Sequence, residues 1–102
     1  MKEIKDIREK LSATELLAQL AEECMELGHA ALKLRRVMSG ENPTPTPPGE
    51  ACEKVSEEIA DVILVLKVLG YDYDSPFHHE SMSSKAKRWI SRLKDKAKTD
   101  GD

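Results

Sequence analysis

Residues 16–34 decide the fold of this chain, and they read LLAQLAEECMELGHAALKL. Steps of about 100° per residue bring their main apolar side chains onto one core-facing stripe of a helix. The members of this stripe are Leu16, Leu20, Leu27, Ala31 and Leu34. Ser12 and Glu15 form a Ser-x-x-Glu capping box, which predicts that the helix begins at Ala13. The helix is expected to end near Gly40.

Three more helices are predicted around this one. Residues 2–10 have helical spacing of isoleucines among charges, and a helix from about Glu50 to Leu69 should stop at Gly70. Ser75 and Pro76 predict the start of a last helix. Its apolar stripe is Met82, Ala86, Trp89 and Leu93.

The segment between the two long helices, residues 39–50, reads SGENPTPTPPGE and is predicted to be a loop because proline disrupts helices. Residues 98–102 are expected to fray. The resulting prediction is a single all-α domain over residues 1–102. It is an antiparallel, four-helix, bundle-like fold with two long central helices.

Composition limits the class of protein. A chain of 102 residues has a small core, so we expect it to assemble as a homo-oligomer. It contains no apolar run of the roughly 18 residues that a membrane span requires, and its first residues do not form a signal peptide, which predicts a cytoplasmic protein without a membrane partner. A net charge of −3 argues against stable binding to duplex nucleic acid.

Two glutamates interrupt the predicted core-facing stripes. Glu23 lies in the middle of the stripe of residues 16–34, and Glu26 lies at its edge. On the third helix, Glu58 interrupts a stripe in the same way and Asp61 flanks it. The apolar members of that second stripe are Val55, Val62, Leu66 and Leu69.

A carboxylate on a core-facing stripe loses several kcal/mol of hydration unless it is protonated, hydrogen-bonded or bound to a cation. If the loop folds the two long helices back antiparallel, the four carboxylates converge into an oxygen-only site suited to Mg²⁺ or Mn²⁺. Magnesium typically joins protein carboxylates to phosphates, so a polyphosphate substrate is indicated. The metal would acidify a water, align it with phosphorus and neutralise charge on the leaving pyrophosphate.

The simpler interpretation of such acidic pairs is a solvated helix surface. Among 19 acidic residues, Glu-x-x-Glu or Glu-x-x-Asp alone is a weak signal. Glu22 and Glu57 fit that interpretation, because both point away from the apolar stripes. Glu23 and Glu58 do not.

These residues carry a resemblance to the MazG-like all-α nucleoside triphosphate pyrophosphohydrolases, whose signature is Glu-Glu-x-x-Glu followed by Glu-x-x-Asp on the next long helix. The chain has EECME at residues 22–26 and EIAD at residues 58–61, and the resemblance covers residues 12–93. It implies hydrolysis of a nucleoside triphosphate to the monophosphate and pyrophosphate, by a dimer or tetramer. It also implies that Glu23, Glu26, Glu58 and Asp61 are the catalytic metal ligands, with Glu22 and Glu57 as secondary helpers.

Basic residues are candidates for contacts with the substrate. Family members often carry a Lys, Asn and Arg pattern on the last helix, where this chain departs from the pattern and offers Lys85 and Arg88. Ammonium and guanidinium groups pair with phosphate oxygens, although a solvated basic helix explains these two residues equally well. Lys33 and Arg36, beyond Glu26, are further candidates for binding the nucleotide, with placement on the surface as the simpler alternative.

Other functions stay open. Glu26-x-x-His29 has the spacing found in di-iron carboxylate bundles, although His29 should point outward. A non-catalytic helical interaction module would explain the leucines but not Glu23 and Glu58. A phosphoribosyl-ATP pyrophosphohydrolase shares the general plan, and the sequence does not reveal the preferred base or sugar.

Overall fold

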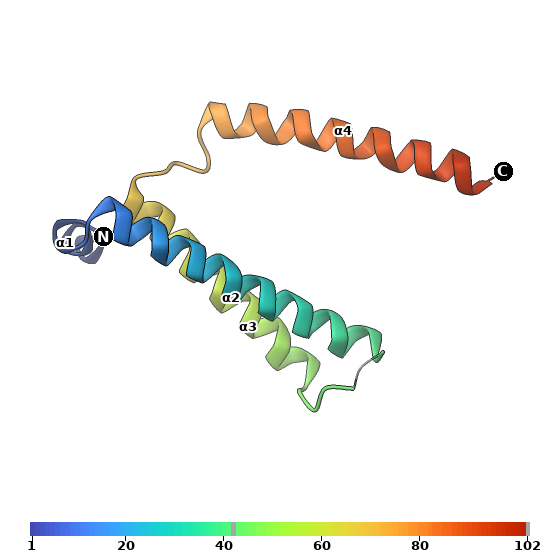
Figure 1. Cartoon of the computed structure of the whole chain (residues 1–102), viewed down its shortest axis with the longest axis horizontal. Helices are drawn as coiled ribbons and strands as arrows, with labels where there is room; N and C mark the ends of the chain where they lie inside the picture. The colour runs from blue at the N-terminus through green and yellow to red at the C-terminus, as the bar shows by residue number, and fades with distance from the viewer. Residues whose placement is uncertain (42, 102) are drawn as a thin grey trace. The chain divides into compact units, whose positions relative to one another are not determined.

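The computed structural model describes residues 1–41 and 43–101, and the regular structure in these ranges is helical (Figure 1). The elements are α1 (Lys2–Lys10), α2 (Ala13–Ser39), α3 (Pro48–Leu69) and α4 (Pro76–Gly101). The all-α prediction is confirmed. In the described ranges, no helix combines the length and apolar character needed to cross a membrane.

The chain divides into two compact units, Met1–Tyr71 and Asp72–Asp102. The first contains α1, α2 and α3, and the second contains α4. A single domain with a four-helix bundle arrangement, and its assembly as a homo-oligomer, stay predictions.

Local signals set the start of α2 and the ends of α2 and α3 as predicted. The Ser12 hydroxyl accepts a hydrogen bond of 3.2 Å from the Glu15 backbone N–H, and α2 begins at Ala13. Gly40 and Gly70 follow α2 and α3 with φ of 69° and 88°, a left-handed conformation that other residues adopt at a cost. Helix α3 begins at Pro48, two residues before the predicted start, because proline is tolerated in the first turn of a helix.

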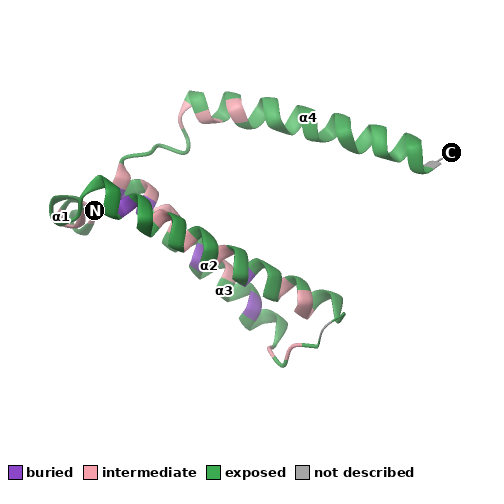
Figure 2. Cartoon of the chain, viewed as in Figure 1, coloured by how far each residue is buried: buried purple, intermediate pink, exposed green. Residues whose placement is uncertain are grey.

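Helices α2 and α3 form an antiparallel hairpin and lie side by side (Figure 1). The more buried positions of α2 recur at alternating intervals of four and three residues, the spacing of coiled-coil contacts. These positions are Leu16, Leu20, Glu23, Leu27, Ala30, Leu34 and Val37. Figure 2 shows that the buried residues of the hairpin lie along both helices.

The prediction was wrong for one member of the core-facing stripe of α2. Ala31 is exposed, and Ala30 is buried instead. After Leu27 the next contact falls three residues later and not four, so the stripe passes through Ala30. The other four predicted members, Leu16, Leu20, Leu27 and Leu34, are buried or half-buried as expected.

Helix α1 docks onto the C-terminal end of α3. The Arg8 guanidinium donates hydrogen bonds of 2.8 Å to the Val68 carbonyl and 2.9 Å to the Lys67 carbonyl. These carbonyls belong to the last turn of α3, where a cation interacts favourably with the helix dipole. Arg8 therefore both caps α3 and holds α1 against it.

The second unit is dominated by α4. The Ser75 hydroxyl accepts a hydrogen bond of 3.3 Å from the His78 backbone N–H, which confirms the predicted N-terminal signal. Helix α4 continues to Gly101, whereas residues 98–102 were expected to fray; Asp102 and Asn42 of the predicted loop lie outside the described residues. The sequence of residues 77–100 contains neither glycine nor proline, and the Thr99 hydroxyl donates to the Asp95 carbonyl at 3.0 Å.

Candidate metal centre

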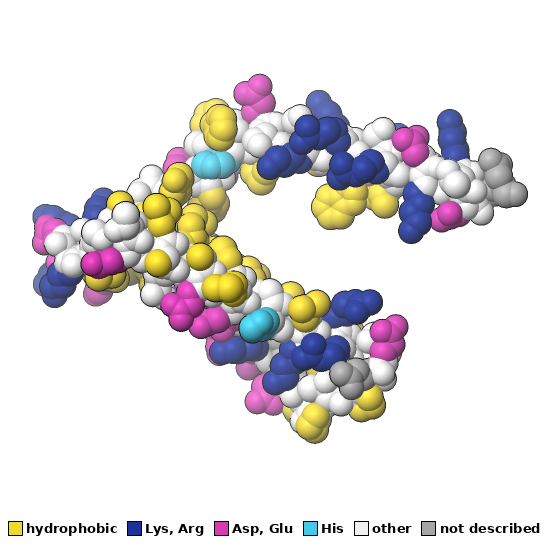
Figure 3. All heavy atoms as spheres, in the orientation of Figure 1, with side chains coloured by type: hydrophobic (Ala, Val, Ile, Leu, Met, Phe, Trp, Pro, Cys, Tyr) yellow, Lys and Arg dark blue, Asp and Glu magenta, His cyan; other side chains and the backbone are white. Residues whose placement is uncertain are grey.

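The four predicted carboxylates converge on the α2–α3 hairpin. Glu23, Glu26, Glu58 and Asp61 each offer one oxygen, and these oxygens all lie within 4.8 Å of one another. Acidic side chains gather on this part of the molecular surface in Figure 3. We call these four residues the carboxylate cluster. Convergence follows from helix packing, because Glu23 and Glu58 occupy core-facing positions of the two helices.

Burial differs strongly within the carboxylate cluster. Glu58 is only 4 % exposed and Glu23 is half-buried, whereas Glu26 and Asp61 are exposed. The Oε2 atoms of Glu23 and Glu58 are buried without a hydrogen-bond partner within residues 1–41 and 43–101. Burying a charged oxygen without a partner is costly, so the folded chain presents unused ligand atoms at this point.

A hard divalent cation fits this donor set. All four groups are carboxylates, the ligand type that Mg²⁺, Mn²⁺ and Ca²⁺ prefer. Two of the oxygens have no hydrogen-bond partner among the described residues, and the exposed side chains of Glu26 and Asp61 leave the cluster open to solvent on one side. Openness matters for magnesium, because it usually keeps several waters or takes phosphate oxygens as further ligands.

Two residues that the sequence analysis did not identify contact the two less exposed carboxylates, those of Glu23 and Glu58. The Gln19 side-chain amide donates a hydrogen bond of 2.7 Å to Glu23 Oε1, and Lys54 Nζ lies 3.0 Å from Glu58 Oε1. Each of them precedes its glutamate by four residues, a spacing that places two side chains on the same helix face. This four-residue spacing is the sequence signal that could have identified Gln19 and Lys54. Glu57, a predicted helper, lies on the outer side with its Oε2 3.9 Å from Lys54 Nζ.

Mutual repulsion of the carboxylates raises the pKa of Glu26. The charge of Glu23 is the largest cause, followed by partial desolvation and the charges of Glu58, Glu22 and Asp61. The predicted helper Glu22 thus acts on the cluster through its charge. The Lys54 pKa is raised in turn, first by its hydrogen bond to Glu58 and then by the charge of that carboxylate. The cluster is a region of negative potential that favours cations.

A groove of about 360 Å³ lies beside the carboxylate cluster. It is lined by Glu26, His29, Ala30, Lys33, Lys54 and Glu58. A smaller groove of about 180 Å³ shares Ala30, Lys33 and Lys54 with it and extends toward Thr46 and Ala51. The predicted substrate-binding residue Lys33 is therefore placed next to the cluster, while Arg36 is half-buried one turn farther along α2. The exposed His29 lines the groove but is not one of the converging ligands.

An apolar groove of about 280 Å³ adjoins Glu23 and Asp61. Its other lining residues come from α1, α2, α3 and the α1–α2 junction: Ile7, Leu11, Leu16, Gln19, Leu64, Val65 and Val68. The cluster thus has lysines along one groove and aliphatic side chains along another.

Comparison of the chain with models of protein families, with curated proteins and with solved structures yields no match. The resemblance of residues 12–93 to the MazG-like enzymes stays a prediction that depends on the signature residues. The geometry of these residues, described above, is independent of that resemblance.

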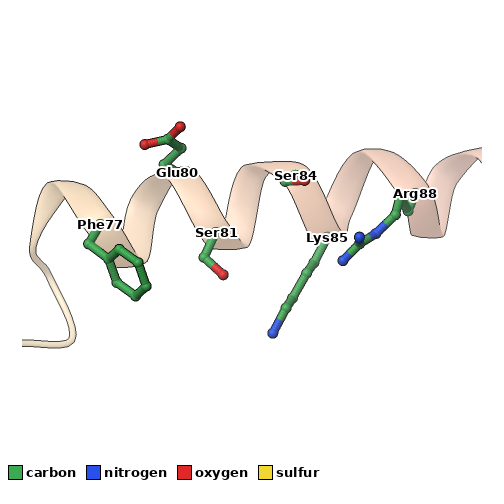
Figure 4. A pocket seen from close by; sticks show the side chains of 6 residues that line it. All are labelled: Phe77, Glu80, Ser81, Ser84, Lys85 and Arg88. Atoms are coloured by element: carbon green, nitrogen blue, oxygen red, sulfur yellow. The ribbon is translucent and has the colours of Figure 1, made fainter.

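Lys85 and Arg88 lie in the second compact unit. They extend from the same side of α4 as Phe77 and Ser81, whereas Glu80 points the opposite way (Figure 4). Together with Ser84, these five residues line a shallow groove of about 330 Å³ on the helix surface. The roles of Lys85 and Arg88 in binding phosphate stay predictions from the sequence.

Proposed function

We propose that this protein is a cytoplasmic, magnesium-dependent hydrolase that converts a ribo- or deoxynucleoside triphosphate to the monophosphate and pyrophosphate. One observation carries the proposal: four carboxylates from two helices offer oxygens within 4.8 Å of one another, and two oxygens of this cluster are buried without a partner. A purely structural hairpin core gains nothing from such an arrangement, since apolar residues at positions 23 and 58 would avoid the desolvation cost.

The residues of the carboxylate cluster would hold the metal, with Mn²⁺ as a possible substitute for Mg²⁺. When bound, the metal would supply an acidified water and would neutralise charge on the triphosphate. Gln19 orients Glu23 by donating to Oε1, which leaves Oε2 free as a ligand. Lys33, in the groove beside Glu26 and Glu58, supplies positive charge where a polyphosphate would extend from the cluster.

The resemblance to the MazG-like enzymes supports the same reaction. Its two signature segments, residues 22–26 and 58–61, contain all four residues of the carboxylate cluster. Resemblance and geometry therefore point to the same four side chains. The choice of a nucleoside triphosphate, among possible polyphosphates, rests on the resemblance.

A substrate panel tests the proposal. The full chain is incubated with magnesium and each of the ribo- and deoxynucleoside triphosphates, with phosphoribosyl-ATP included, and pyrophosphate release is measured. Glu58→Gln should lower the rate at least about 100-fold, because it removes one ligand charge from the centre. Glu53→Gln, at an exposed position of α3, is the matched control and should retain the rate. Equal rates for Glu58→Gln and the unaltered chain would refute the proposal.

A double variant separates this function from a helical interaction module. Replacing Glu23 and Glu58 with leucine should abolish metal binding if they are ligands. A module that only pairs with a partner helix would keep its partner and become more stable, with no metal binding to lose.

Self-association is a further part of the proposal. Met82, Trp89 and Leu93 on α4 are 52 %, 63 % and 52 % exposed within the described part of the chain. A repeated apolar face of this kind is typical of a helix that packs against another surface. Sedimentation equilibrium should give a dimer or tetramer, and a monomer at all accessible concentrations would contradict this part.

A further inference from the structure

Lys54 occupies the place of a cation at the most buried carboxylate of the cluster. Its Nζ lies 3.0 Å from Glu58 Oε1, and Glu58 is 4 % exposed. Its other contact, Glu57 Oε2 at 3.9 Å, is longer. A charge-assisted hydrogen bond of this length to a buried carboxylate is a direct alternative to coordination of a metal by the same group.

The pairing is incomplete in two respects. A single ammonium group balances one of the four negative charges of the cluster, and Glu58 Oε2 stays buried without a partner. The lysine side chain is 58 % exposed, so it can leave without breaking the core. Lys54 also lines both grooves beside the cluster, which gives the displaced ammonium a place next to solvent.

We propose that the Lys54 ammonium is a built-in substitute for the metal cation, which pairs with Glu58 in the metal-free protein and is displaced when a divalent ion binds. The inference rests on the metal-binding part of the proposed function and adds a competitor to it. Lys54 stabilises the metal-free hairpin by reducing repulsion among the carboxylates. It also raises the concentration of metal required to fill the centre, because the ion must displace an existing partner.

This role predicts the direction of a mutational effect. If Lys54 competes with the metal, Lys54→Met should bind Mn²⁺ about three- to fivefold more tightly than the unaltered chain, the upper part of the range expected for loss of a partly exposed ion pair. If Lys54 instead holds the ligands in place, the same change should weaken binding. Lys54→Arg keeps the charge and should keep the affinity close to its original value.

Lys33→Met is the matched control for charge alone. Lys33 lines the same groove, but in the described part of the chain the ion pair with Glu58 comes from Lys54. Removing the Lys33 charge should therefore change Mn²⁺ affinity by less than about twofold, as expected for a screened charge without a direct contact.

The experiment is calorimetric titration of Mn²⁺, without nucleotide, into the full-length unaltered chain and the three variants. Thermal unfolding in chelator is measured alongside. We expect Lys54→Met to bind Mn²⁺ most tightly of the four forms. Compared with the unaltered chain, its unfolding midpoint should be lower in chelator and should rise more when Mn²⁺ is added. Equal or weaker binding by Lys54→Met than by Lys33→Met would overturn it while leaving the metal centre intact. Failure of every form to bind Mn²⁺ would overturn both the inference and the proposed function.

A structure of the Mn²⁺-bound protein gives a second test. The distance between Lys54 Nζ and Glu58 Oε1 should exceed 4.0 Å, the limit of an ion pair, once Glu58 coordinates the metal. Retention of the 3.0 Å contact beside a bound ion would overturn the displacement.

Discussion

Replacing Glu58 with leucine should stabilise the metal-free protein, although it removes a residue of the centre. Glu58 is 4 % exposed and its Oε2 has no hydrogen-bond partner, a situation that costs about 1–3 kcal/mol. The change also removes the ion pair with Lys54, which is worth at most about 1 kcal/mol because the lysine is 58 % exposed. We therefore expect Glu58→Leu to raise the free energy of unfolding by about 1–2 kcal/mol. For a domain of this size, this corresponds to a rise of roughly 5–15 °C in the unfolding midpoint.

The assay is thermal unfolding followed by circular dichroism, in chelator and in excess magnesium. The unaltered chain should gain about 2.7 kcal/mol when magnesium reaches 100 times its dissociation constant, whereas Glu58→Leu should gain little. The order of stability should therefore reverse between the two conditions. Glu53→Leu, at an exposed position of the same helix, should change the free energy of unfolding in either condition by no more than about 0.5 kcal/mol. Destabilisation of Glu58→Leu in chelator would show that the glutamate is satisfied in the metal-free fold and would refute the reasoning.

Three further predictions concern protonation, docking and capping. Because Glu23 and its neighbours raise the folded-state pKa of Glu26 above its ordinary value of 4.5, the Glu26 carboxylate binds a proton more tightly in the folded metal-free protein than in the unfolded chain. The free energy of unfolding should therefore rise as the pH falls through the raised pKa, as measured by unfolding at a series of pH values. The affinity for Mn²⁺ should fall over the same pH range, as measured by titration. Arg8→Met should cost about 1–2 kcal/mol and increase hydrogen exchange in α1, with Lys5→Met as the exposed control. Ser12→Ala should cost about 1 kcal/mol in urea unfolding, and unchanged stability would contradict the role of the cap.

Helix boundaries were predictable because their causes are local. Ser12 bonds the backbone three residues ahead, and Gly40 and Gly70 each adopt a conformation that glycine favours. None of these effects depends on the rest of the fold. The docking of α1 was not predictable, since Arg8 reaches carbonyl groups about 60 residues away and nothing in the local sequence indicates that partner.

The convergence of the carboxylates was predictable for a different reason. Glu23 and Glu58 interrupt apolar stripes, and two stripes that pack together bring their interruptions into contact. The exact members of the stripe were harder to predict. A count of 100° per residue does not show whether the contact between the helices continues through Ala30 or through Ala31. The contacts of Lys54 and Gln19 with the carboxylate cluster were not predicted. In a sequence, polar residues beside a core-facing stripe cannot be distinguished from surface residues, because the direction of each side chain is unknown.

The loop between α2 and α3 connects the two helices that carry the carboxylate cluster. Glu23 and Glu26 come from one arm of the hairpin, and Glu58 and Asp61 from the other, so each arm carries two of the four carboxylates. If the carboxylate cluster binds a metal as proposed, divalent ions should strengthen the reassociation of the two peptides produced by cleavage between Ser39 and Pro48. The hairpin could then serve as a split reporter, in which recombination of the fragments reads out the free metal concentration.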